Sequence, residues 1–157
     1  MTTKNNYLLK SHELFDQRVA ELNQEILKLR EKKLTLEQLA QHPAVKLAKR
    51  VYKATFEIIP ADPNHPDYRL DGELRKYRRY KKGLERYRLF FGFSSQPKII
   101  LYLYLNDECT LRKEGSKSDP YEQFKKLVRQ EKVSHDPADL KIQKWLKDYS
   151  WEITAEG

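Results

Sequence analysis

The sequence predicts an α+β fold in which helices come first, a small antiparallel sheet follows, and further helices close the chain. Two patterns indicate this order. Apolar residues recur every three or four positions over the first third of the chain, as in amphipathic helices, but alternate with a period of two between residues 86 and 105, as in strands. A length of 157 residues suits one domain with a substantial core, residues 1–157. Within it we expect a helical region at 1–59, a basic sheet and site region at 68–135, and a C-terminal helix and tail at 136–157.

The first helix is predicted from Lys10 to Lys33. Its buried stripe consists of Phe15, Val19, Leu22, Ile26 and Leu29. Thr35 and Gln38 have the spacing of a capping box, in which each side chain satisfies a free backbone N–H of the other residue. A second, short helix should therefore begin at Leu36.

A third helix is predicted after His42-Pro43, because proline interrupts a helix but is tolerated in a first turn. Its buried face should consist of Ala44, Ala48, Val51, Thr55 and Ile58. The three prolines of "IPADPNHPD" then impose an extended linker.

Two strands joined by a short polar connection predict an antiparallel hairpin, "RYRLFFGFSS" (86–95) and "IILYLYLN" (99–106). In the first strand we expect a core face of Tyr87, Leu89, Phe91 and Phe93. The opposite, partly basic face should hold Arg86, Arg88, Phe90 and Gly92. In the second strand Ile99, Leu101, Leu103 and Leu105 should share a face. The segment "DYRL" before the turn signal Asp71-Gly72 is a candidate for a further short strand.

Two helices are predicted after the hairpin. Asp119 can cap the first, with Pro120 at its first position, and its core face should hold Tyr121, Phe124 and Val128. The last helix should start near Asp136-Pro137 and bury Leu140, Trp145 and Tyr149.

The chain has one cysteine, Cys109, which excludes an intramolecular disulfide and a cysteine-based metal cage. No window approaches the ~20 apolar residues of a membrane span, and the amino terminus lacks the apolar stretch of a signal peptide. We therefore expect a cytoplasmic protein without membrane contact.

The positive charge is concentrated in one block, Arg75–Arg88. It carries eight basic side chains against one glutamate, and so accounts for seven of the eight net positive charges of the chain. A single basic block in an otherwise near-neutral chain indicates a polyanionic partner. Tyr77, Tyr80 and Tyr87 are interleaved with the cations, which favours unpaired RNA, since rings can stack on free bases. The alternative is a solvated basic face whose tyrosines belong to the core.

The common catalytic motifs are absent, including phosphate-binding glycine loops, HExxH and GxSxG. The four histidines, His12, His42, His65 and His135, lie in flanks away from the basic hairpin, so a mechanism with two histidines is not expected. Asp107 and Glu108 are adjacent acids in a turn, where solvation is commoner than magnesium binding. We therefore expect no metal and no cofactor.

What remains is a set of side chains that can handle phosphate: Arg79, Lys81, Arg86, Arg88, Arg112, Lys113 and Lys117, with Tyr121 as a candidate proton donor. RNA supplies its own nucleophile, the 2′-OH, so a protein can cleave it by orienting that group and stabilising the charge on phosphorus. Binding without cleavage is the open alternative.

In several further motifs the chain resembles the YhaV toxins of bacterial toxin-antitoxin systems, within the wider RelE-like group of ribonucleases. The resemblance runs from about Phe15 to Pro137. It is carried by the order of "IPADPNHPDYR", Arg79-x-Lys81, "YRLFF", "KII", "NDECTLR" and "SKSDPYEQF".

The resemblance implies a compact RelE-like fold with helices on one side of the sheet, and a metal-independent endoribonuclease that cleaves mRNA, on or off the ribosome, and inhibits translation. It also implies an AbrB-like (PrlF-type) antitoxin, with operator DNA bound through the complex. The residues carried over to catalysis are Arg79, Lys81, Arg88, Arg112 and Tyr121, and Asp119 also lies on the pattern. RNA contacts are expected from Arg75, Arg78, Lys82, Arg86, Lys113 and Lys117.

Two departures from the family pattern stand out. Tyr77 stands where the family usually has tryptophan, and Gly92 replaces an arginine that follows "LFF". Arg86, expected on the same strand face, is a candidate to replace that lost cation. The departures leave two further readings open: a non-catalytic RNA-binding or ribosome-associated protein, and a mainly structural component of an operator-binding complex.

Overall fold

A mixed, six-stranded sheet lies at the centre of the molecule in a computed structural model that describes residues 2–151. The strands are β1 (Thr3–Lys4), β2 (Tyr7–His12), β3 (Arg78–Tyr80), β4 (Leu89–Ser95), β5 (Lys98–Leu105) and β6 (Leu146–Asp148). Their order is β1-β2-β5-β4-β3, with β6 pairing with β2. All pairs are antiparallel except β2 with β5, which is parallel. The hairpin of β4 and β5 is confirmed, but the prediction of a purely antiparallel sheet is wrong.

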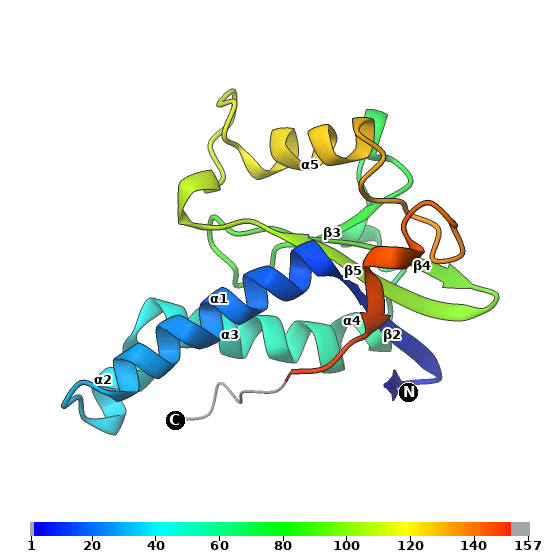
Figure 1. The fold of residues 1–157 in the computed structure, drawn as a ribbon. Helices are drawn as coiled ribbons and strands as arrows, with labels where there is room; N and C mark the ends of the chain where they lie inside the picture. The colour runs from blue at the N-terminus through cyan, green and yellow to red at the C-terminus, as the bar shows by residue number, and fades with distance from the viewer. Residues whose placement is uncertain (1, 152–157) are drawn as a thin grey trace.

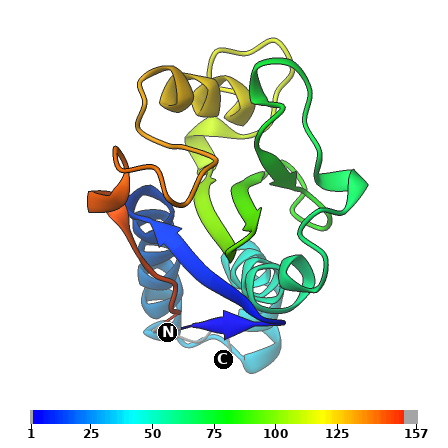
Figure 2. The same ribbon diagram turned by 90° about the vertical axis from the view of Figure 1, so that its right-hand side faces the viewer.

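Helices cover both sides of this sheet (Figure 1). The helices are α1 (Glu13–Arg30), α2 (Leu36–Gln41), α3 (Pro43–Lys53), α4 (Ile59–Ala61) and α5 (Pro120–Arg129). A π-helical turn, Ala54–Ile58, joins α3 to α4. The long helices α1 and α3 lie on one side and α5 lies on the other, as the rotated view in Figure 2 also shows. The expectation of helices on one side only is therefore wrong.

An apolar core lies on each side of the sheet, and a third cluster packs where α1, α2 and α3 meet. The α1-side core contains Phe15, Val51, Leu89, Phe91, Ile100 and Tyr102, among others. The α5-side core contains Phe90, Leu101, Leu103 and Phe124, among others. The face of β4 opposite to Leu89 and Phe91, predicted to be partly basic, is thus a second core where it lies beneath α5.

A bulge in β5 explains why its leucines do not share one face. Phe90 pairs with Tyr104 and Phe91 pairs with Tyr102, so Leu103 has no residue opposite it. One extra residue shifts the alternation of side chains beyond it. Leu103 therefore packs in the α5-side core whereas Leu105 packs in the α1-side core.

The N-terminal end of the predicted first helix is a strand. Residues 7–12 form β2, which pairs with β5 and β6, and the helix begins only at Glu13, where the His12 side chain accepts a hydrogen bond from the backbone N–H of Leu14. Pairing with a distant strand overrides the helical pattern here, as tertiary context often does. The predicted capping box of Thr35 and Gln38 is confirmed.

The predicted C-terminal helix is absent from the described part of 136–157; residues 152–157 lie outside it. Asp136 and Asp139 each accept a hydrogen bond from the backbone N–H two residues later, and such local bonds compete with helix formation. The chain continues through a 3₁₀ turn, Gln143–Trp145, into β6. Leu140 is 88% exposed, but Tyr149 is fully buried, as expected. The Tyr149 hydroxyl lies 3.0 Å from the hydroxyl of Thr55.

The remaining elements are short. The segment "DYRL" is not a strand: Pro66–Tyr68 is a 3₁₀ turn, and a single bridge pairs Arg69 with Arg78. Asp119 caps α5 as predicted, by accepting a hydrogen bond from the backbone N–H of Tyr121. None of the helices among residues 2–151 is long and apolar enough to cross a membrane.

Candidate nucleic-acid interface and active site

Arg79 lies on β3, the edge strand, and marks the first half of the site. It pairs with Phe90 of β4, and directly paired residues project from the same face of a sheet, so Arg79 projects on the α5 side. A cavity of about 630 Å³ opens beside it. We call it the Arg79 cavity; its lining is Ile58, Asp62, His65, Asp67, Tyr68, Arg79, Tyr80, Lys81 and Lys82. The predicted residues Arg79, Lys81 and Lys82 are thus brought together.

The arginines of the basic block have hydrogen-bonding capacity to spare. Arg79 is only 9% exposed, and its Nε and Nη1 atoms have no partner among the described residues. The buried Nε atoms of Arg78 and Arg88 also lack one there. Leaving such a donor unsatisfied costs about 1–3 kcal/mol, and more for a charged group. An anion that met these donors, after rotation of the side chains, would offset that cost.

The other bonds of these arginines are to backbone oxygens and an amide. Arg78 donates to the carbonyl of Tyr77 and to Asn64 Oδ1, and its guanidinium lies over the ring of Phe93. Arg88 donates from Nη1 to the carbonyl oxygens of Glu85 and Tyr87, at 2.6 and 2.7 Å. Among the described residues neither forms an ion pair with a carboxylate, so no acidic side chain there competes with a ligand for these guanidinium groups.

His65, Tyr68 and Asp67 are residues of this cavity that the sequence interpretation missed. The Arg79 Nη2 atom donates to the Asp67 carbonyl at 3.3 Å, and the Asp67 backbone N–H donates to His65 Nδ1 at 3.1 Å. The expectation that all four histidines lie away from the basic hairpin is therefore wrong for His65, and also for His135, whose backbone lies against Gly92 of β4. These three residues belong to the family motif "IPADPNHPDYR", which could have indicated them as site residues; this segment folds back beside β3.

The tyrosines of the basic block belong to the cores. Tyr77 is 5% and Tyr80 is 4% exposed, and Tyr87 packs against the α1-side core. Burial raises the pKa of Tyr77 to about 12 and also raises the pKa of Tyr80. The alternative interpretation of the block is confirmed for Tyr77 and Tyr80, whose buried rings are not available to stack on bases, whereas Tyr87 is half-buried. Tyr68 is the partly exposed tyrosine of the Arg79 cavity, and burial raises its pKa too.

The second half of the site surrounds Arg112. Its guanidinium donates to Asp119 Oδ1 at 2.7 Å and lies over the ring of Tyr121, 4.9 Å from the centroid. The hydrogen bond to Asp119 raises the pKa of Arg112, which therefore stays charged. A cavity of about 290 Å³ opens here. This Arg112 cavity is lined by Arg112, Gly115, Ser116, Lys117, Asp119, Tyr121, Glu122 and Lys125.

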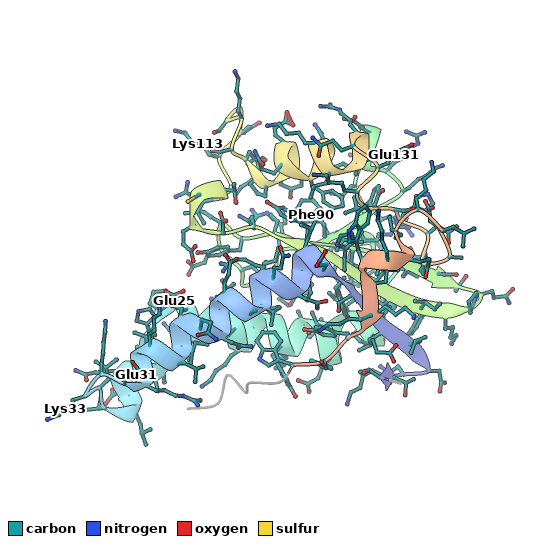
Figure 3. The ribbon with its side chains drawn as sticks, in the orientation of Figure 1. Glu25, Glu31, Lys33, Phe90, Lys113 and Glu131 are labelled. Atoms are coloured by element: carbon teal, nitrogen blue, oxygen red, sulfur yellow. The ribbon has the colours of Figure 1, made fainter. Side chains whose placement is uncertain are left out.

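Backbone and side-chain bonds tie the two halves together. The Arg112 backbone N–H donates to the carbonyl of Arg86 at 2.9 Å, and Arg86 Nε donates back to the carbonyl of Arg112 at 3.1 Å. Asn106, fully buried, accepts from the Arg88 backbone N–H and donates to the carbonyl of Arg86. The ring of Phe90, between β4 and α5 in Figure 3, meets Tyr121 edge-on. Asn106 is thus a structural residue, as expected.

Some predicted residues lie elsewhere. Arg75 is exposed and bonds to the carbonyl of Gly72 within its own turn. Lys113 is exposed in the loop that leads to α5, next to the Arg112 cavity but not among the residues that line it (Figure 3). Arg86 lies before β4 begins, so the idea that it replaces a cation at Gly92 is wrong.

Gly92 is covered by backbone. A Cβ added there would lie 2.7 Å from the carbonyl oxygen of His135, so this position has no room for a side chain unless the His135 segment moves. The ring of His135 packs edge-on against Tyr77. An open phosphate-binding surface is therefore absent at this point of β4.

Among residues 2–151, no group of three or more histidine, cysteine, aspartate or glutamate side chains is placed to hold a metal ion. The site is defined instead by two cationic cavities on a basic α+β chain, an arrangement typical of proteins that bind polyanions.

Comparison with known proteins gives the family. Residues 9–144 match the family model of YhaV toxins, described as toxins with endonuclease activity, of a toxin-antitoxin system. The chain is 34% identical over 140 residues to the ribonuclease toxin YhaV of Escherichia coli strain K12, covering 86% of this chain and 88% of that protein. The same figures hold for the toxin YhaV of Escherichia coli O157:H7. No solved structure matches the chain. The chain therefore belongs to the YhaV family of toxins, enzymes with endonuclease activity that act within toxin-antitoxin systems.

Proposed function

We propose that this toxin is a metal-independent endoribonuclease that cleaves mRNA in the cytoplasm and thereby inhibits translation. The observation that carries the proposal concerns Arg79: two of its guanidinium nitrogens have no partner among residues 2–151, and it lines a cavity that also holds two lysines. The Nε atoms of Arg78 and Arg88, in the same basic block, also lack a partner there. Planar guanidinium groups match the geometry of phosphate oxygens and can bind them in pairs.

The proposed reaction uses the 2′-OH of the RNA as the nucleophile. Its oxygen forms a bond to phosphorus, the bond to the 5′-oxygen breaks, and a 2′,3′-cyclic phosphate results. Arg79 and Lys81 would hold the phosphate and stabilise the negative charge that develops on its oxygens, with Arg88 beside them. Removal of one such donor typically slows an enzyme about 10²–10³-fold.

Arg112 and Tyr121 are proposed to bind the RNA strand on the other side of Phe90. The pairing of Arg112 with Asp119 fixes the guanidinium, and its side chain retains 31% exposure. Lys117 and Lys125 line the same cavity and add positive charge. A strand that crossed both cavities would place successive phosphates on the two groups of cations.

We further propose that the partner of the toxin is an AbrB-like (PrlF-type) antitoxin and that the complex binds operator DNA through it. This rests on the family to which the chain belongs. Action on the ribosome is compatible with the same chemistry, since positioning of the 2′-OH can be shared between ribosome and toxin.

The test is cleavage of a defined RNA by the purified protein in the presence of a chelator. We expect cleavage and products that end in 2′,3′-cyclic phosphate. The variant Arg79→Ala/Lys81→Ala should lose at least 10²-fold in rate. The matched control is Arg75→Ala/Lys76→Ala, which removes the same charge from exposed positions of the same block and should retain activity.

Full activity of Arg79→Ala/Lys81→Ala would contradict the site assignment. Cleavage that stops in chelator and returns with Mg²⁺ would contradict the mechanism. RNA binding without any cleavage, with or without ribosomes, would support a non-catalytic RNA-binding protein.

A further inference from the structure

His65 and His12 differ in how their ring nitrogens are used. In His12 both are occupied: Nδ1 accepts from Leu14, and Nε2 lies 2.8 Å from the carbonyl oxygen of Lys132. In His65 Nδ1 accepts from the backbone N–H of Asp67, but Nε2 has no hydrogen bond to any residue from 2 to 151. The side chain is 45% exposed and lines the Arg79 cavity. Its Nε2 is therefore available to a ligand.

Asp67 holds His65 and Arg79 next to each other. Its backbone N–H binds the histidine, its carbonyl accepts from the guanidinium, and its carboxylate Oδ2 lies 3.7 Å from His65 Nδ1. When His65 is neutral, the bond from the backbone N–H requires the ring proton to be on Nε2. When it is protonated, Nδ1–H faces the carboxylate. The protonated ring can give its Nε2 proton to a ligand in the cavity, and the neutral ring that results carries its remaining proton on Nδ1, which faces the carboxylate.

We propose that His65 is the general acid that protonates the leaving 5′-oxygen of the RNA, a role that rests on the ribonuclease function proposed above. The 2′-oxygen forms its bond to phosphorus and releases its proton to water. The bond from phosphorus to the 5′-oxygen breaks, its electron pair stays on that oxygen, and the oxygen takes the Nε2 proton. Neutral His65 then regains a proton from solvent.

The charges around His65 are of both signs. The carboxylates of Asp62 and Asp67 line the cavity together with the cations Arg79, Lys81 and Lys82. Tyr68, whose ring centroid is 5.4 Å from that of His65, and Tyr80 complete the titratable groups of the cavity. Histidine changes charge between about pH 5 and 8, so a histidine acid loses its proton as the pH rises through this range.

The molecule contains a matched control for His65. His42 also precedes a proline, and its Nδ1 also accepts from the backbone N–H two residues later, at 3.1 Å. His42 caps α3 and is not among the residues that line the described cavities. Asparagine is a good cap residue, so His65→Asn and His42→Asn both retain the cap and remove an imidazole.

The experiment compares cleavage of two RNAs of the same sequence. One is ordinary, and in the other sulfur replaces the bridging 5′-oxygen at the cut site, which makes a leaving group that does not need a proton. On ordinary RNA, His65→Asn should be about 10²–10⁴-fold slower than wild type, the usual contribution of a general acid. On the sulfur-containing RNA it should cleave close to the wild-type rate. His42→Asn should match wild type on both.

The pH profile gives a second readout. The wild-type rate on ordinary RNA should fall as the pH rises from 6 to 8, and His65→Asn should lack this fall. Equal losses on both RNAs would show that His65 only positions the site, and an unchanged rate on ordinary RNA would exclude it altogether; either result overturns the proposal. If the wild type cleaves neither RNA, the proposed function itself fails.

Discussion

The guanidinium of Arg112 donates to the carboxylate of Asp119 at 2.7 Å, and the Asp119 side chain is only 3% exposed. The same carboxylate accepts from the backbone N–H groups of Lys113 and Tyr121. One residue thus caps α5, closes the loop before it and orients a cation of the Arg112 cavity.

Asp119→Ala should therefore reduce both stability and activity. It removes a cap and three hydrogen bonds, one of them charge-assisted, so we expect a loss of about 2–4 kcal/mol in the free energy of unfolding. Asp119→Asn should lose less, because only one of the donors would face its NH₂ group. Urea unfolding measures both. Asp136→Ala, which removes a comparable bond from an exposed turn, should cost less than about 1 kcal/mol; equal losses would contradict the central role of Asp119.

Gly92→Ala should destabilise the fold. The added Cβ would lie 2.7 Å from the carbonyl oxygen of His135, so the His135 segment or β4 must shift, at a cost of about 1–3 kcal/mol. Ser95→Ala, at an exposed position of the same strand, is the control and should be nearly neutral. Thermal or urea unfolding checks the pair, and a neutral Gly92→Ala would show that the His135 segment yields freely.

Tyr149→Ala should cost about 3–5 kcal/mol, since it empties a fully buried aromatic site between α1 and the sheet. Tyr149→Phe retains the ring and loses the contact with the Thr55 hydroxyl, so it should cost about 1–2 kcal/mol. Exposed Leu140→Ala should change little, although the sequence pattern placed it in the same helix face. Comparable effects of Tyr149→Ala and Leu140→Ala would contradict the observed packing.

Stability should decrease as the pH falls below neutrality, in part through His12. Burial lowers the pKa of His12 from its ordinary value of 6.5, so between these two values the unfolded chain binds the additional proton. The stability present above the unfolded pKa is therefore lost as the pH falls toward the folded pKa. Burial raises the pKa of nearby Asp16, which acts with the opposite sign from pH 3.8 upward. His12→Asn, which retains a cap, should reduce the loss of stability between pH 7.5 and 5.5 in urea unfolding; an unchanged pH dependence would exclude His12.

The sequence predicted features that depend on neighbours in the chain. The capping box of Thr35 and Gln38 and the Asp119 cap are local, and both were found where the residues indicated. The β4–β5 hairpin is nearly local and was also predicted. Both the basic block and the family resemblance indicate Arg79 and Lys81, and these two residues line one cavity.

What the sequence missed depends on distant contacts. Residues 7–12 form a strand because β5 and β6 supply hydrogen bonds from 91 and about 135 residues away. His65 reaches the site because the linker folds back along β3, where Arg69 pairs with Arg78. The prolines of this linker predict an extended segment, whereas Pro66 opens the turn that His65 caps. The periodicity of apolar residues in the sequence does not indicate where a distant segment folds back against a strand.

The position of β2 bears on how the toxin is made. This strand lies inside the sheet. One of its edges pairs with β5, residues 98–105, and part of the other pairs with β6, residues 146–148, so both partners come late in the sequence. A chain emerging from the ribosome N-terminus first can form α1 and α3 early, but it completes the sheet only when nearly all of it has been synthesised. We therefore expect the active toxin to appear only when its synthesis is almost finished.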